Sequence, residues 1–315
     1  MIAFIFPGQG SQAVGMGKAL AQQFPECREV FEEADAALGK PLSQLIFEGP
    51  AEELTLTENT QPAILTTSIA ACRALASQGI EPEMVAGHSL GEYSAHVAAG
   101  TFEFADAVRV VRNRGRYMQE AVPVGTGAMA AILGLDAEKA EQACREAAEG
   151  DIVSAANLNA PGQVVIAGTA AAVARASERA KALGAKRVIA LQVSAPFHCA
   201  LMKPAEVRLA PELRALPAQS PGVPVVANVD AMPKRDLQSS IDALVAQVSA
   251  PVRWEAVMRR MVGDGAKIFI EVGPGSVLSG LGRKVVPDAT FMRIDSPEHL
   301  EDIVALVAAQ RGVRS

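Results

Sequence analysis

The sequence predicts an α/β fold, and three observations support that prediction. Short apolar runs typical of buried strands recur along the chain, and long helical patterns lie between them. One strand-to-helix junction carries a Gly-x-Ser-x-Gly sequence, as the nucleophile turn of α/β-hydrolase folds does. Near the middle of the chain, the order of elements becomes that of a ferredoxin-like unit. We therefore expect an α/β-hydrolase-like large subdomain with a mainly parallel sheet, and a ferredoxin-like small subdomain inserted in it.

The composition restricts the classes of function. The chain has 315 residues, half of them hydrophobic, which is enough for one large domain or for a large and a small one. Its net charge of −6 and isoelectric point of about 5.4 argue against nucleic acid as the main partner.

The cysteines and the apolar segments bear on location. The four cysteines are widely spaced, without a Cys-x-x-Cys pair or zinc-ligand spacing, which favours reduced thiols in a cytoplasm and indicates no metal site. The apolar start is short, lacks a basic flank and ends at Pro7, so we interpret it as a strand and not a signal peptide. No apolar run approaches the roughly 20 residues that span a bilayer. We expect a cytoplasmic protein that does not bind membranes.

The elements expected for the large subdomain follow from apolar periodicity. In the first part of the chain they are a strand at 2–6, helices at 16–38, 59–78 and 104–121, and a strand–helix pair at 83–99. After residue 199 the alternation returns, with strands at 225–227 and 267–272.

The segment between these two parts has its own pattern. The expected elements are strands at 129–133, 152–156, 163–167 and 187–193, with helices at 137–148 and 171–183. This βαββαβ order is the ferredoxin-like arrangement. We therefore divide the chain into a large subdomain of residues 1–124 and 199–315 and a small subdomain of residues 125–198.

The strongest local signal is Gly-His-Ser-Leu-Gly at residues 87–91, directly after the apolar run at 84–86. In this context Ser89 is expected on a sharp turn with its hydroxyl outward, as a nucleophile. Flanking glycines permit such a turn because a Cβ there would clash with neighbouring backbone. The N–H of Leu90, at the start of the next helix, would be one oxyanion donor. The alternative interpretation is an ordinary tight turn.

A nucleophilic serine needs a base, and the chain has four histidines. His88 adjoins Ser89 and its side chain should diverge from it, so it is expected to support the turn. His96 lies about two helical turns further on, and His299 stands in a charged segment typical of surface. His198 follows Pro-Phe at the junction of the two subdomains, where clefts form. It is the best candidate for the base, and a buried structural histidine is the alternative.

Several further motifs, in order along almost the whole chain, carry a resemblance to a known family. They are Pro7-Gly8-Gln9-Gly10-Ser11-Gln12, the Gly-His-Ser-Leu-Gly motif, Asn59-Thr60-Gln61-Pro62-Ala63, Arg114-Gly115-Arg116-Tyr117-Met118, Asn157 to Gln163, Ala195-Pro196-Phe197-His198, Gln247 ahead of Pro251-Val252-Arg253-Trp254, and Glu271-Val272-Gly273-Pro274-Gly275. With these motifs the sequence resembles the malonyl-CoA:acyl carrier protein transacylase family.

The resemblance implies roles for residues that the chain alone does not assign. It makes the backbone N–H of Gln9 the second oxyanion donor. It implies that a backbone carbonyl at Gln247 orients His198, with Asn157 nearby in the substrate site. A Ser–His dyad then suffices, because a carbonyl that accepts from Nδ1 fixes the tautomer of the base.

The resemblance also implies the substrate. Arg114 matches the family's carboxylate-binding arginine, and a planar bidentate donor suits a free carboxylate in a dry pocket. In related polyketide acyltransferases, phenylalanine at the position of Phe197 goes with malonyl. The expected activity is transfer of malonyl from malonyl-CoA to the phosphopantetheine thiol of acyl carrier protein in fatty acid synthesis. Malonyl-CoA is then a substrate, and no cofactor or metal is expected.

Other functions fit less well. Gly8-x-Gly10-x-x-Ala13 after a strand matches a dinucleotide-binding fingerprint, but some twenty residues on the chain is helical and does not end a strand with an acid. A serine esterase or thioesterase would not need Arg114. A binding module with an incidental motif would require the spaced motifs to be coincidence. An acyltransferase that serves a polyketide synthase would differ only in its carrier.

Overall fold

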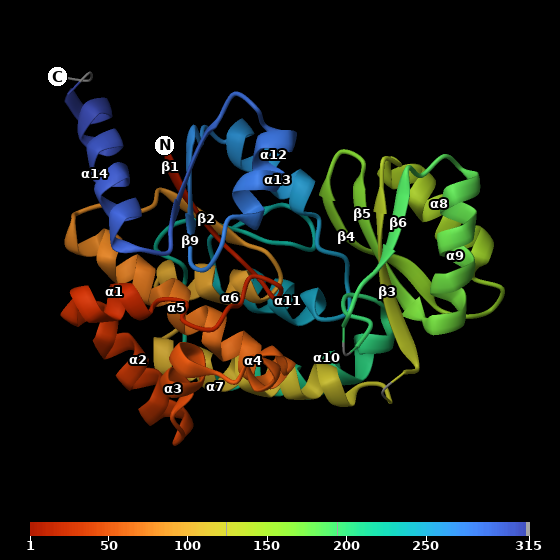
Figure 1. Ribbon diagram of the computed structural model, residues 1–315, viewed down its shortest axis with the longest axis horizontal. Helices are drawn as coiled ribbons and strands as arrows, with labels where there is room; N and C mark the ends of the chain where they lie inside the picture. The colour runs from red at the N-terminus through yellow and green to blue at the C-terminus, as the bar shows by residue number, and fades with distance from the viewer. Residues whose placement is uncertain (124, 194, 313–315) are drawn as a thin grey trace.

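The computed structural model describes residues 1–123, 125–193 and 195–312, and two sheets organise it (Figure 1). The larger sheet has the order β10-β9-β1-β2-β7-β8. Its pairings are parallel except that of β8 with β7. The strands are β1 (Ile2–Phe6), β2 (Met84–Gly87), β7 (Val225–Val226), β8 (Pro233–Lys234), β9 (Ile268–Val272) and β10 (Thr290–Ile294). The predicted α/β fold with a mainly parallel sheet is confirmed.

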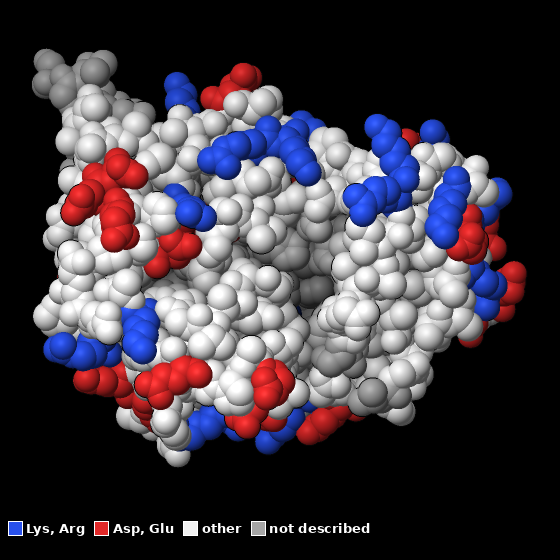
Figure 2. Space-filling view, viewed as in Figure 1, with Lys and Arg blue, Asp and Glu red and all other residues white. Residues whose placement is uncertain are grey.

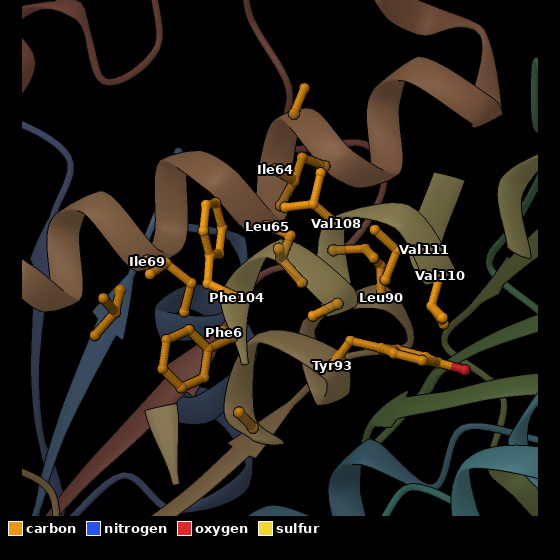
Figure 3. Packing of buried hydrophobic residues seen from close by; sticks show 14 of the residues in the cluster. Phe6, Ile64, Leu65, Ile69, Leu90, Tyr93, Phe104, Val108, Val110 and Val111 are labelled. Atoms are coloured by element: carbon orange, nitrogen blue, oxygen red, sulfur yellow. The ribbon is translucent and has the colours of Figure 1, made fainter. Parts of the chain in front are cut away.

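Alternate side chains of β1 enter two different cores, as the period of a strand requires. Phe4 and Phe6 belong to the larger core with α5 (Thr57–Ser77), α6 (Leu90–Ala98) and α7 (Phe104–Glu120). Figure 3 shows Ile64, Leu65 and Ile69 of α5 facing Phe6 and α6 in this core. Ala3 and Ile5 instead join the core that contains α12 (Trp254–Gly263) and α13 (Val277–Val285). Helices therefore cover both faces of the large sheet.

One predicted helix is wrong. The pattern over residues 16–38 forms two helices, α1 (Lys18–Gln23) and α2 (Pro25–Leu38), separated by Phe24 in an extended conformation. The ring of Pro25 disfavours helical backbone at the residue before it, whereas proline fits the first position of a new helix. The helices at 59–78 and 104–121 and the strand–helix pair at 83–99 are confirmed, with small shifts at their ends.

Like α12 and α13, the remaining helices of the large subdomain were not part of the prediction. They are α3 (Leu42–Glu48), α4 (Ala51–Thr55), α10 (Lys203–Ala215), α11 (Leu237–Gln247), α14 (Pro297–Gly312) and the short 3-10 helix Ala200–Met202. Among the described residues, no helix combines the length and the apolar character needed to cross a membrane.

The second sheet lies beside the first and is antiparallel, with the order β4-β5-β3-β6 (Figure 1). Its elements are β3 (Gly127–Leu133), α8 (Ala137–Ala147), β4 (Val153–Ala160), β5 (Gln163–Thr169), α9 (Ala170–Ala182) and β6 (Arg187–Ala190). The ferredoxin-like pattern is confirmed. Residue 124, at the expected subdomain boundary, lies outside the described residues.

β3 and β5 each extend two residues beyond their predicted ranges, and the other two strands differ more. β6 ends three residues early, and β4 continues through the expected turn to Ala160. The register of β4 against β5 shifts near Asn157, which also bridges to Val252 of the large subdomain. Strand β4 therefore serves both its own sheet and the junction with the large subdomain.

The corner between β2 and α6 is held by close backbone contacts. Ser89 has φ 52° and ψ −107°, a conformation that L-residues rarely adopt. A Cβ on Gly87 would lie 1.9 Å from the Gly91 carbonyl carbon, and one on Gly91 would lie 2.1 Å from the Phe6 carbonyl oxygen. The turn therefore packs directly against the end of β1, where the Gln9 loop begins.

We expect Gly91→Ala to lower the free energy of unfolding by about 1–3 kcal/mol, because the added methyl group must displace the backbone of Phe6. Chemical denaturation measures this change. Gly280→Ala is the matched control, since Gly280 is an exposed helical glycine whose Cβ would meet nothing within 4 Å. Alanine there should stabilise by up to about 1 kcal/mol. Equal effects at the two positions would contradict the close packing of the corner.

Candidate active site

The predicted site residues gather in one pocket of about 310 Å³. Figure 2 shows the surface hollowed between the elements of the large sheet and those of the small sheet. The pocket is lined by all but one of the candidates: Gln9, Ser89, Leu90, Arg114, Asn157, Phe197 and His198. The exception, Gln247, does not line the pocket but forms hydrogen bonds with Ser89, Arg114 and His198. Segments far apart in the sequence therefore converge on Ser89.

Ser89 is positioned by the strained corner and by two hydrogen bonds to its main chain. Its N–H donates to the Asn228 Oδ1 at 2.8 Å, and its carbonyl oxygen accepts from the Gln247 Nε2 at 2.8 Å. Leu90 is the first residue of α6, so its N–H is one of those that a helix leaves without an internal acceptor. An oxygen held on Ser89 would therefore lie beside an available donor.

Ser89 and His198 are directly bonded. The distance from the Ser89 Oγ to the His198 Nε2 is 2.7 Å, and the His198 Nδ1 lies 3.0 Å from the Gln247 carbonyl oxygen. A carbonyl can only accept, so Nδ1 carries the ring proton and Nε2 is left to accept from the serine. This tautomer is the one that proton removal from Ser89 requires.

His198 lies 3% exposed, and its environment disfavours the charged ring. Burial lowers the pKa of His198 to about 3, and the positive charge of Arg114 acts in the same direction. The imidazole is therefore neutral at physiological pH and able to accept a proton.

Arg114, on α7, is a buried cation held by uncharged partners. Only 1% of it is exposed. Its Nη1 donates to the Gln61 Oε1 and one Nη2 bond goes to the Gln247 Oε1, both at 2.8 Å. The Nη2 also lies 3.2 Å from the Ser89 Oγ, and the Nε has no hydrogen-bond partner. Among the described residues no carboxylate pairs with this guanidinium, so the pocket presents a positive charge next to the serine.

Asn157 and Phe197 form part of the pocket wall and are nearly buried, at 7% and 8% exposed. Asn157 lies at the irregular point of β4, where the flanking residues Ala156 and Leu158 exchange main-chain bonds with Val252. The fixed backbone there forms one side of the pocket.

Sequence reasoning missed Glu92 and Asn228. Glu92 is fully buried in the first turn of α6, and its Oε2 accepts from the Gln247 Nε2 and from the Asn228 N–H. Burial raises the pKa of Glu92 to about 7. An acid among the apolar residues after the serine was a usable signal for Glu92. Asn228, which also donates to the Gly87 carbonyl, follows a two-residue strand and gave no such signal.

The other histidines lie as expected or nearly so. The His88 Nε2 lies 2.9 Å from the Asn159 Oδ1, so His88 links the serine turn to β4 and does not bond to Ser89. His96 is fully buried, and its Nδ1 contacts the Thr101 Oγ1 at 3.1 Å. His299 is not simply solvated, because it pairs with Asp295 at 2.8 Å. Within the described ranges, no three His, Cys, Asp or Glu side chains gather as metal ligands do.

Comparison with known proteins identifies the family of the chain. The sequence profile of the acyl transferase domain matches residues 3–294. The malonyl CoA-acyl carrier protein transacylase of Bacillus subtilis (strain 168) is 52% identical over 301 residues, which cover 95% of each chain. The crystal structure of an acyl carrier protein S-malonyltransferase from Vibrio cholerae has a TM-score of 0.94 and 46% identity, and covers 96% of this chain and 99% of that one. A malonyl-transacylase solved in complex with its type II polyketide synthase acyl-carrier protein gives the same four values. The chain belongs to the malonyl-CoA:acyl carrier protein transacylase family of acyl transferases.

Proposed function

We propose that this chain is a malonyl-CoA:acyl carrier protein S-malonyltransferase of fatty acid synthesis. It moves malonyl from malonyl-CoA to the phosphopantetheine thiol of acyl carrier protein through a malonyl ester on Ser89. The observation that carries the proposal is the buried guanidinium of Arg114, which lies 3.2 Å from the Ser89 Oγ and has no carboxylate partner among the described residues. A hydrolase for neutral esters has no use for such a charge.

In the first half-reaction, the His198 Nε2 takes the proton of Ser89 while Oγ attacks the thioester carbonyl. The carbonyl oxygen becomes an oxyanion that accepts from the N–H groups of Leu90 and Gln9. The tetrahedral adduct collapses, the C–S bond breaks, and the CoA sulfur leaves with the proton from His198. In the second half-reaction the carrier thiol gives its proton to His198 and attacks the ester, and Ser89 regains its proton.

Throughout both steps Arg114 binds the free carboxylate of the malonyl group. Planar guanidinium and carboxylate groups match in a bidentate pair, which fixes the acyl chain as well as its charge. Asn157 and Phe197 bound the same space, and the ring of Phe197 limits substitution at the α-carbon. Gln247 orients His198 through its main-chain oxygen.

The chain itself supplies every group in this scheme, so we propose that the enzyme needs no metal or cofactor. We also propose that it acts in the cytoplasm. We further propose the subdomain boundaries 1–124 with 199–315, and 125–198. All four strands of the antiparallel sheet fall in the inner segment, which supports that division.

An acyltransferase that serves a polyketide synthase is the second candidate. The similarity to a malonyl-transacylase in complex with a type II polyketide synthase carrier favours keeping it. The acyl chemistry is identical, and only the carrier differs. Rates of transfer to a fatty acid carrier and to a polyketide carrier, measured side by side, separate the two.

Ser89→Ala should abolish the covalent malonyl adduct, because among the described residues Ser89 alone is bonded to the His198 Nε2. Intact-mass analysis after mixing with malonyl-CoA detects the adduct, and addition of holo carrier protein should remove it from the unmodified enzyme. Ser94→Ala is the control, since Ser94 is a buried serine on the same helix with no hydrogen-bond partner. An adduct on the Ser89 variant at the native rate would mean that the nucleophile is another residue.

The pH dependence of acylation should show no inflection at the ordinary histidine pKa of 6.5, since burial and Arg114 hold the pKa of His198 to about 3. The neutral ring is the base, so the rate falls only below its pKa. We expect the single-turnover acylation rate to stay nearly constant from about pH 7.5 to about pH 5.5.

Two variants show which group is responsible for any inflection in the pH profile of acylation. His198→Ala should slow acylation by roughly 10²–10⁴-fold at all these pH values. Burial raises the pKa of Glu92 to about 7, so an inflection that disappears in Glu92→Gln belongs to that carboxyl. An inflection near pH 6.5 that survives in Glu92→Gln would contradict the lowered pKa of His198.

Arg114→Ala should reduce kcat/KM for malonyl-CoA by the equivalent of roughly 2–5 kcal/mol, much of it the cost of an unpaired buried charge. Acetyl-CoA has no carboxylate, so its kcat/KM should hold or rise. Arg112→Ala is the matched control, because Arg112 lies on the same helix but faces Glu58 at the surface. A parallel fall for both donors in the Arg114 variant would show that Arg114 is structural.

A further inference from the structure

Gln61 is the residue that accepts a hydrogen bond from the Nη1 of Arg114. It lies in the early part of α5, is 2% exposed, and lines the pocket with Arg114 and Met118. Its Oε1 accepts from the Arg114 Nη1 at 2.8 Å. On its other side, the acceptor that the described residues offer to the Nε2 is the weakly accepting Met118 Sδ, at 3.8 Å. The strong bond of this side chain is therefore the one to the guanidinium.

The arginines of α7 differ in how their charge is balanced. Arg109 pairs with Asp106 at 2.8 Å, and Arg112 lies 3.9 Å from Glu58, both at the surface. Arg116 is exposed and bonds to the Asn113 Oδ1. Arg114 is buried, and amide oxygens of Gln61 and Gln247 take the places that carboxylates have beside Arg109 and Arg112. An amide satisfies the N–H groups of a guanidinium without cancelling its charge, whereas a carboxylate does both.

The nearest acid in the network does not cancel that charge directly. Glu92 is separated from Arg114 by the side chain of Gln247, which bonds to both. Burial raises the pKa of Glu92 to about 7, so this carboxyl is only partly ionised at neutral pH. The positive charge of Arg114 is thus left for whatever enters the pocket.

We infer that Gln61 is a specificity-determining residue, which orients Arg114 through a neutral acceptor and so keeps its charge available to a carboxylated acyl group. This inference rests on the proposed function. A carboxylate at position 61 would form the ion pair within the protein, and the pocket would then favour neutral acyl donors. An apolar residue there would loosen Arg114 without changing the charge of the pocket.

Two variants of nearly equal size test this. Gln61→Glu keeps the acceptor and adds a charge, while Gln61→Leu removes the acceptor and adds none. kcat/KM is measured for malonyl-CoA and for acetyl-CoA with one holo carrier protein, and thermal unfolding reports on the fold. In Gln61→Glu we expect the malonyl-to-acetyl ratio to fall about 100-fold or more, with acetyl transfer unchanged or faster. In Gln61→Leu, malonyl transfer should fall by about 10-fold and the preference for malonyl should persist.

Each outcome decides the matter. A folded Gln61→Glu enzyme with the unmodified donor ratio would overturn the inference, and so would a Gln61→Leu enzyme that loses its malonyl preference as fully. If Gln61→Glu does not fold, the ratio in Gln61→Leu alone decides. The proposed function fails separately: the unmodified enzyme would then show no preference for malonyl-CoA, whatever residue stands at position 61.

Discussion

The site depends on one residue, which contributes both its side chain and its main-chain carbonyl. Gln247, the last residue of α11 and fully buried, accepts from the His198 Nδ1 with its main-chain oxygen and from Arg114 with its Oε1. Its Nε2 donates to the Ser89 carbonyl and to Glu92. Both N–H groups of the amide donate and its oxygen accepts, so the nucleophile, the base and the buried cation are all positioned by Gln247. Bonds shared in this way rigidify a buried network, although the Arg114 Nε and the Glu92 Oε1 have no partner among the described residues.

The strained serine turn is stable because several independent contacts hold its backbone in place. A non-glycine residue at φ 52° and ψ −107° carries strain that must be offset elsewhere. Asn228 bonds to the N–H of Ser89 and to the carbonyl of Gly87, and Gly91 packs on the backbone of Phe6. The strand β1 therefore supplies both the support of the turn and, through the loop after Phe6, the proposed second oxyanion donor. One close backbone approach thus supports both of the proposed oxyanion donors.

The sequence predicted those features of the fold and the site that depend on residues close together in the chain. Alternating apolar runs and the Gly-x-Ser-x-Gly motif indicated the parallel sheet and the serine corner, because strand burial and glycine contacts act over a few residues. The break at Phe24 was also a local signal, because Pro25 disfavours helical backbone at the residue before it. The prediction of one long helix overlooked this signal. The pairing of Asn228 with Ser89 joins residues 139 positions apart, and no periodicity encodes such a contact. The family resemblance, and not spacing, led to Gln247 and Arg114.

Arg114 also connects substrate choice to base strength. Its positive charge acts with burial to lower the pKa of His198, so the free enzyme holds a neutral but weak base. In the proposed mechanism a malonyl carboxylate pairs with that guanidinium and cancels the repulsion, so the pKa of His198 rises in part, while burial, the larger cause, still holds it below its ordinary value. A stronger base removes the Ser89 proton more readily. An acyl group without a carboxylate leaves the repulsion in place, and water alone in the pocket does the same. In this mechanism, the charge that is proposed to bind the correct donor also keeps the nucleophile less reactive until that donor arrives.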